Sequence, residues 1–209
     1  MEDKLLADSV SSQDHGLFEL SGKLVVITGG AGLLGSTYAD AILTHNGKVV
    51  LLDISQTSLN RCLEHLSSKF NDSSIFGYQI DLTDEDSVRQ TVNEITRTHG
   101  PVHALINNAA NNPKVEQGES DFTDFETFPI DRWKADIDVG LTGAFLCTKY
   151  FGKTMAENKN GGVIINISSD LGLISPDQRL YRRPGQPEEK QPKKPVSYSV
   201  TKTGIIGLT

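Results

Sequence analysis

Tyr198 and Lys202 are the two residues of this sequence whose types and spacing most directly suggest chemistry. Residues four apart lie on the same face of a helix, so the ammonium of the lysine can lie near the phenol of the tyrosine. A neighbouring positive charge favours the phenolate, which can accept a proton as a general base. The same spacing is also common in ordinary surface contacts, so the pair needs support from other parts of the chain.

A glycine-rich segment at residues 28–35, Thr-Gly-Gly-Ala-Gly-Leu-Leu-Gly, provides that support. It follows an apolar run at 24–27 and precedes an amphipathic segment and a second apolar run at 49–52 that ends in Asp53. Glycine allows a tight turn and lets a pyrophosphate approach the amides at the start of a helix. A carboxylate at the end of the second strand can accept hydrogen bonds from an adenosine ribose. Together these features predict a dinucleotide site.

The elements that would position these residues alternate between apolar runs typical of strands and amphipathic segments typical of helices. Strands are expected at 24–28, 49–53, 75–80, 103–107 and 162–168, and helices at 33–45, 55–69, 84–98, 130–157 and from about Ser197 onward. Each crossover is long enough for a right-handed βαβ unit. The sequence therefore predicts an α/β fold of the Rossmann type, a doubly wound parallel sheet between two layers of helices.

We expect one domain at residues 17–209, preceded by a flexible tail at 1–16. Residues 111–127 are rich in Asn, Asp, Glu and Ser and should form a loop after the fourth strand. Residues 175–195 carry five prolines and many charges. This segment could be a linker, but it leads directly to Tyr198, so we interpret it as an active-site loop.

Composition restricts the classes of function. The 209 residues carry a formal net charge of −7, which argues against a nucleic-acid or anionic-membrane binder. The sequence has no apolar stretch long enough to span a bilayer and no signal-peptide pattern. Cys62 and Cys147 are its only cysteines, and the histidines lack metal-ligand spacing, so we expect buried thiols, a cytoplasmic location and no metal.

Several motifs in order make residues 20–209 resemble the short-chain dehydrogenase/reductase family. The matching pieces are the 28–35 loop, Asp53, Asp81, Asn107-Asn108-Ala109, Asn166-Ile-Ser-Ser169 and Tyr198 with Lys202. The resemblance implies that Tyr198 is the acid/base, that Lys202 holds the nicotinamide ribose, and that Ser169 bonds the reacting oxygen; packing would suffice for Ser168. It also implies a cofactor site made of Thr28, Gly29, Gly32, Leu33, Leu34, Gly35, Asp53, Ile54, Asp81, Leu82, Asn107, Asn108, Ala109, Tyr198 and Lys202.

The type of dinucleotide follows from charge. Asp53 would accept hydrogen bonds from ribose hydroxyls and repel a 2′-phosphate, and the glycine loop contains no Lys or Arg to attract one. NAD(H) is therefore expected in preference to NADP(H).

Three features depart from the usual family pattern. The glycines at 29, 32 and 35 have the spacing of the extended branch, which contains sugar-nucleotide epimerases and dehydratases. Gly140 stands where the family commonly has an Asn that holds a proton-relay water. The inserted segment 175–195 would hang over the substrate cleft, where its basic residues could be solvated or could capture a phosphorylated or acidic sugar: Arg179, Arg182, Arg183, Lys190, Lys193 and Lys194.

The resemblance implies NAD-linked, reversible oxidation of a secondary alcohol. The overall pattern is similar to oxidoreductases of bacterial surface-glycan and flagellin-sugar pathways, which suggests a sugar-like substrate. An NAD-binding module without catalysis and a sugar-nucleotide epimerase or dehydratase remain alternatives. Family members continue beyond the position of Thr209, so we expect a C-terminally truncated sheet, and homo-oligomers formed through the 130–157 and 197–209 helices.

Overall fold

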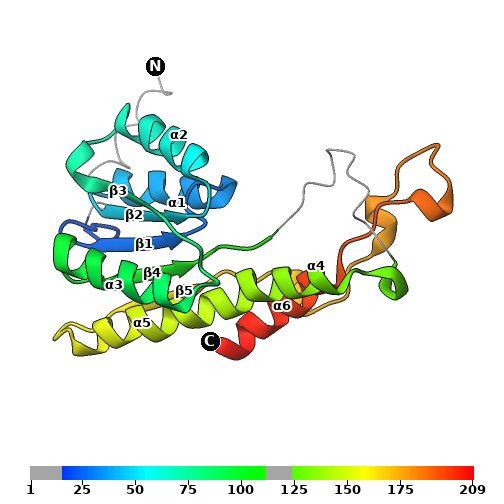
Figure 1. The fold of residues 1–209 in the computed structure, drawn as a ribbon. Helices are drawn as coiled ribbons and strands as arrows, with labels where there is room; N and C mark the ends of the chain where they lie inside the picture. Colours follow the sequence, from blue (N-terminus) through cyan, green and yellow to red (C-terminus); the bar gives the residue numbers. More distant parts are fainter. Residues whose placement is uncertain (1–15, 112–123) are drawn as a thin grey trace, which may run out of the picture.

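The computed structural model describes residues 16–111 and 124–209. Residues 1–15 of the tail expected at 1–16, and residues 112–123 of the loop expected at 111–127, lie outside the described residues. The rest of the chain forms a sheet between layers of helices (Figure 1), which confirms the predicted α/β class.

The sheet has five parallel strands in the order β3-β2-β1-β4-β5. All five lie where the apolar runs predict them, with ends shifted by one or two residues: β1 (Leu24–Thr28), β2 (Lys48–Asp53), β3 (Ile75–Gln79), β4 (Ala104–Asn107) and β5 (Val163–Asn166). The strand order reverses between β1 and β4. In open α/β sheets a ligand binds beyond the carboxyl ends of the strands at this reversal.

Alternation of apolar side chains along the strands builds one core on each side of the sheet. On β1, Leu24 and Val26 pack into the core shared with α3 (Glu85–His99) and α5 (Gly143–Glu157). Val25 and Ile27 pack into the opposite core, shared with α1 (Leu33–Thr44) and α2 (Gln56–Ser67). A fully buried parallel strand is apolar on both faces, which explains the unbroken apolar run.

The long helix expected at 130–157 is present with an interruption. It consists of α4 (Ile130–Ile137), a π-helical turn (Asp138–Thr142) and α5. Gly140 lies in the π-helical turn, where an added Cβ would be 2.4 Å from Cγ2 of Thr201. The side-chain space at position 140 is therefore already filled by a residue of the last helix.

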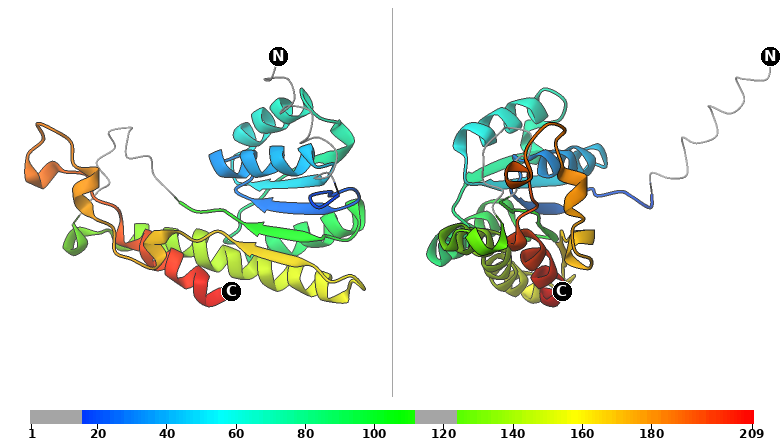
Figure 2. Two further views of the ribbon diagram at one scale, coloured as in Figure 1. Left: turned by 180° about the vertical axis from the view of Figure 1, so that it is seen from behind. Right: turned by 90° about the vertical axis from the view of Figure 1, so that its right-hand side faces the viewer.

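That last helix, α6 (Val196–Leu208), packs against α4, the π-helical turn and a 3₁₀ turn after β5 (Asp170–Gly172). Its first turn is held by Ser197, whose hydroxyl donates a hydrogen bond to the buried carboxylate of Asp136 on α4. The inserted segment 175–195 precedes α6 and projects beyond its start, away from the sheet (Figures 1 and 2). In the described part of the chain, no helix has both the length and the apolar character needed to cross a membrane.

Candidate active site

The glycine loop makes the tight turn that the sequence predicts between β1 and α1. Gly29 has a φ of +60°, a backbone conformation that residues with a Cβ rarely adopt. An added Cβ at Gly35 would be 2.3 Å from the carbonyl oxygen of Gly29, so only glycine allows this approach.

The start of α1 is exposed and carries no side-chain cap. Its N-cap residue is Gly32, which has no hydroxyl or carboxylate to bond the first amides. Leu33 is 85% exposed and Leu34 is 50% exposed, although both are apolar. Uncapped amides at a helix N-terminus attract anions, so the local geometry fits a pyrophosphate.

Asp53 ends β2 beside this loop, as predicted. Its Oδ2 accepts a hydrogen bond from the Ala31 amide at 3.1 Å, and its Oδ1 accepts one from the Ser55 amide at 3.0 Å. The carboxylate is only partly buried, so lone pairs remain accessible to a ligand. Asp53 therefore both supports the glycine loop and fits a ribose.

Thr28 and Asn108 connect the glycine loop to the end of β4. Thr28 Oγ1 accepts hydrogen bonds from the amides of Asn108 and Ala109, at 2.9 and 3.1 Å. Asn108 Nδ2 donates to the carbonyl oxygens of Thr28 and Gly29, at 2.9 and 3.2 Å. These two residues hold the loop against the neighbouring strand.

Asn107 points away from this surface, into the protein. It is 4% exposed, and its Nδ2 donates to Asn166 Oδ1 at 2.8 Å and to Thr148 Oγ1 at 3.0 Å. Its side chain thus ties β4 to β5 and α5. Within this motif, Asn108 and Ala109 are the residues that are not fully buried.

The remaining expected cofactor residues differ in exposure. Ile54 is 64% exposed, and Asp81 is an exposed residue whose Oδ1 accepts from the amide and hydroxyl of Thr83. Leu82 is buried in the core on the α3 and α5 side, so its side chain serves packing.

Lys202 is buried on α6 with its ammonium at the end of the sheet. Its Nζ donates a 2.6 Å hydrogen bond to the carbonyl oxygen of Ile167, the residue after β5. The same Nζ lies 5.9 Å from the centroid of the Tyr198 ring. Burial, with a further contribution from the charge of Lys194, lowers the pKa of Lys202 below its usual value. Tyr198 and Lys202 therefore lie near each other at the carboxyl end of β5.

The two serines after β5 have different partners. Ser168 Oγ donates to the carbonyl oxygen of Lys202 at 2.8 Å and so fixes α6 to the sheet, the structural role expected for it. Ser169 Oγ donates to Asp170 Oδ1 at 2.8 Å and accepts from the Leu171 amide at 3.2 Å. Within the described residues it makes no hydrogen bond to Tyr198. To bond a substrate oxygen, Ser169 must exchange its contact with Asp170.

The inserted segment does not present an array of basic charges to a ligand. Arg179 pairs with Asp177, Arg182 with Glu188, and Lys193 with Asp124. Hydrogen bonds from Arg179 lower the pKa of Asp177 to about 2. These three cations are paired within the described part of the chain, which favours the alternative of a solvated loop for them.

From the sequence alone, Lys194 is expected only as one of the basic residues of the inserted segment, without a contact to Tyr198. Its Nζ lies 3.7 Å from the centroid of the Tyr198 ring, and its burial lowers its pKa below the usual lysine value. One signal was available: Lys194 precedes Tyr198 by the same four positions that separate Tyr198 from Lys202.

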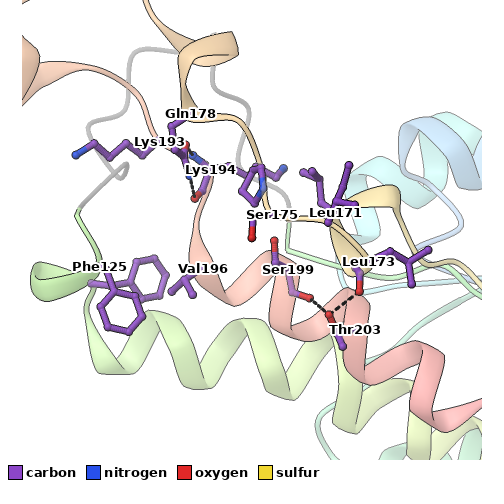
Figure 3. Close-up of a pocket in the computed structure, with 14 residues that line it drawn as sticks. Phe125, Leu171, Leu173, Ser175, Gln178, Lys193, Lys194, Val196, Ser199 and Thr203 are labelled. Carbon is purple, nitrogen blue, oxygen red and sulfur yellow. Dashed lines mark hydrogen bonds between the residues drawn. The ribbon is translucent and has the colours of Figure 1, made fainter.

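A cavity of about 440 Å³ lies beside this pair, on the neighbouring face of α6. Figure 3 shows Ser199 and Thr203 at its floor, with Lys194 and Gln178 from the inserted segment. Its apolar lining residues include Phe125, Phe128, Leu171, Leu173 and Val196. Lys194 both lines the cavity and contacts the ring of Tyr198.

A doubly wound parallel sheet with this glycine turn and a carboxylate at the end of β2 defines a Rossmann-type, dinucleotide-binding protein. Comparison with protein families narrows the class. The family model described as short chain dehydrogenase matches residues 23–181, and the chain belongs to this family.

Among curated proteins, the chain is 30% identical over 190 residues to an uncharacterized oxidoreductase of Thermotoga maritima, covering 91% of this chain and 64% of that one. It is 30% identical over 196 residues to a mitochondrial borneol dehydrogenase of Lavandula x intermedia, with coverages of 92% and 63%. An NAD-dependent glycerol dehydrogenase of Listeria innocua is 25% identical over 192 residues, with coverages of 92% and 64%. The chain thus spans less than two thirds of the length of these relatives.

Solved structures confirm the fold. A short-chain type dehydrogenase/reductase from Mycobacterium marinum superposes with a TM-score of 0.77 at 22% identity, covering 93% of this chain and 69% of that one. ElxO with NADP bound gives a TM-score of 0.70 at 29% identity, with coverages of 90% and 65%. Relatives with either dinucleotide therefore exist, and the family alone leaves the choice between NAD and NADP open.

Proposed function

We propose that the protein is an NAD-linked oxidoreductase that interconverts a secondary alcohol and a ketone. The observation that carries this proposal is the position of Lys202. Its buried ammonium is bonded to the main chain just after β5 and stands beside Tyr198, at the same sheet edge as the glycine loop. Family membership supports the same reaction type.

In this proposal Tyr198 takes the hydroxyl proton of the alcohol, and Lys202 favours the phenolate that does so. Ser169, released from Asp170, bonds the reacting oxygen. The amides at the start of α1 hold the pyrophosphate, and Asp53 accepts hydrogen bonds from the adenosine ribose. A bound nicotinamide supplies the carbon that accepts or returns the hydride.

Asp53 supports NAD(H) as the preferred cofactor, because a carboxylate at the end of β2 would repel a 2′-phosphate. The NAD dependence of the Listeria glycerol dehydrogenase agrees with this preference, whereas the NADP of ElxO shows that relatives can differ. Mutation of Asp53 therefore tests the cofactor preference.

For the substrate we propose a sugar or a related polyol that binds in the cavity beside Tyr198. Ser175 and Lys194 are polar residues of its lining, which suits hydroxyl-rich molecules. The apolar side of the cavity also admits a hydrophobic alcohol, the type named for the Lavandula relative. Turnover with polyols and with terpene alcohols distinguishes the two substrate classes.

The decisive experiment replaces Tyr198 with Phe in the full-length protein. Turnover should fall by at least a hundredfold, because the proton acceptor is lost, whereas NADH binding measured by fluorescence should change little. Tyr150→Phe on α5 is the matched control and should keep wild-type turnover. Wild-type-like turnover in Tyr198→Phe would refute the assignment.

A second candidate, an NAD(H)-binding module without catalysis, is favoured by one observation. The Ser169 hydroxyl is bound to Asp170 instead of facing Tyr198. If this arrangement persists, the full-length protein binds NADH with normal affinity but turns over none of the sugars, polyols or terpene alcohols offered.

We also propose that the protein works as a homo-oligomer in the cytoplasm. An apolar groove formed by Leu141, Phe145 and Leu208 supports self-association through α5 and α6. Cys62 and Cys147 are free and buried, and burial raises the pKa of Cys147 to about 12, which agrees with a reducing compartment.

A further inference from the structure

Lys194 is fixed by the inserted segment before it reaches Tyr198. Its amide donates to Gln178 Oε1 at 2.8 Å, and its carbonyl oxygen accepts from Gln178 Nε2 at 3.3 Å. Pro195 follows it as the N-cap of α6 and restricts the backbone further. The amide and the carbonyl group of Lys194 are therefore both fixed, and this fixes the position of its Cα, from which the side chain extends.

The ammonium of Lys194 lies over the face of the Tyr198 ring, with its Nζ 3.7 Å from the ring centroid. A cation in this position is attracted to the neutral ring. It is attracted far more strongly once the phenol ionises, because two opposite unit charges then lie a few ångströms apart. The contact therefore favours the phenolate over the phenol.

Other charged and titratable groups also face Tyr198. Lys202 on α6 lies 5.9 Å from the ring centroid, and Tyr181 of the inserted segment interacts with Tyr198 electrostatically. Asp170, in the turn after β5, acts on Tyr181. The ammonium groups of Lys194 and Lys202 repel each other, and a phenolate near both of them offsets that repulsion.

We propose that Lys194 is a positioning residue of the acid/base site, whose ammonium lies over the Tyr198 ring and stabilises its phenolate. The inserted segment thus supplies a second cation to Tyr198. This inference rests on the proposed role of Tyr198 as the acid/base, but its test requires no turnover.

The ionisation of Tyr198 can be measured directly by ultraviolet difference titration of tyrosinate between about pH 7 and 11. Subtracting the titration of Tyr198→Phe isolates Tyr198 from the other four tyrosines. For each Lys194 variant, the titration of the double variant that also carries Tyr198→Phe is subtracted in the same way. Lys194→Met should raise the midpoint of Tyr198 ionisation by about one pH unit, because it removes an opposite charge within a few ångströms.

Two variants separate charge from packing. Lys194→Arg keeps a cation that can stack on the ring, so its midpoint should return to near the wild-type value. Lys193→Met removes the adjacent lysine, whose ammonium pairs with Asp124, and should leave the midpoint unchanged. Thermal unfolding of each variant verifies that the fold is retained.

An unchanged midpoint in Lys194→Met overturns the inference, and so does an equal shift in Lys194→Arg and Lys194→Met. Failure of the proposed function has a different signature. In that case Tyr198→Phe keeps its turnover, whatever the titration shows.

Discussion

Asp53 has two roles that mutation can separate. Its carboxylate bonds the amides of Ala31 and Ser55, and it also carries the charge that we expect to exclude a 2′-phosphate. Asn at this position keeps an accepting oxygen but loses the charge, whereas Ala loses both.

Asp53→Ala should weaken NADH binding by about 1.5–3 kcal/mol through lost charge-assisted hydrogen bonds, and should strengthen NADPH binding because a repulsion is removed. Asp53→Asn should give the same gain for NADPH with a smaller loss for NADH. Fluorescence titration of both cofactors into the wild type and the two variants measures these changes. Equal affinity of the wild type for NADH and NADPH would contradict the proposed role.

At the scale of elements, the packing of the π-helical turn against α6 explains a departure from the family pattern. The family resemblance leads one to expect an Asn at position 140, where this chain has Gly. A Cβ added to Gly140 would be 2.4 Å from Cγ2 of Thr201. Loss of the Asn is therefore coupled to a close approach of two helices.

Gly140→Ala tests this coupling. Helix propensity alone would stabilise the protein by about 0.8–1 kcal/mol, but overpacking against Thr201 costs about 1–3 kcal/mol, so the free energy of unfolding should fall by about 1 kcal/mol. In a Thr201→Ser background, which lacks Cγ2, the same change should be neutral or stabilising.

The matched control is Gly152→Ala on α5, where an added Cβ makes only an ordinary 3.5 Å contact with Ile164 Cδ1. It should not destabilise the protein. Urea unfolding of the four Gly140 and Thr201 combinations gives the coupling energy, and strict additivity would show that the two residues do not compete for space.

At the scale of the whole molecule, apolar side chains are exposed along β5, α5 and α6. Val163 and Ile165 on β5 are 58% and 44% exposed, and Phe145 on α5 is 48% exposed. Exposed apolar surface of this extent is typical of an interaction face. A second copy of the chain would bury the groove beside Phe145.

We therefore expect the protein to form dimers or larger oligomers in light scattering at micromolar concentration. Phe145→Glu should shift it to monomers, because a charge in an apolar interface is left without a partner. Leu17→Glu, which changes an 80% exposed residue near the start of the described chain, should leave the oligomer intact. A monomeric wild type would contradict self-association.

The sequence by itself determined the order of the elements, the glycine turn and the pairing of Tyr198 with Lys202. These features depend on local periodicity and on residues four apart, which a single stretch of chain encodes. All five strands and the main helices lie where these patterns predict them.

Only the tertiary structure decided which side chains face the cleft. Asn107 and Leu82 belong to motifs expected at the cofactor, yet both are buried: Asn107 is bonded to Thr148 of α5, and Leu82 lies in the core shared with α3 and α5. Ser169 is bound to its neighbour Asp170, and Lys194, whose main chain is bonded to Gln178, lies over the ring of Tyr198. Such contacts join residues through the packing of an irregular segment, for which no periodic pattern exists in the sequence.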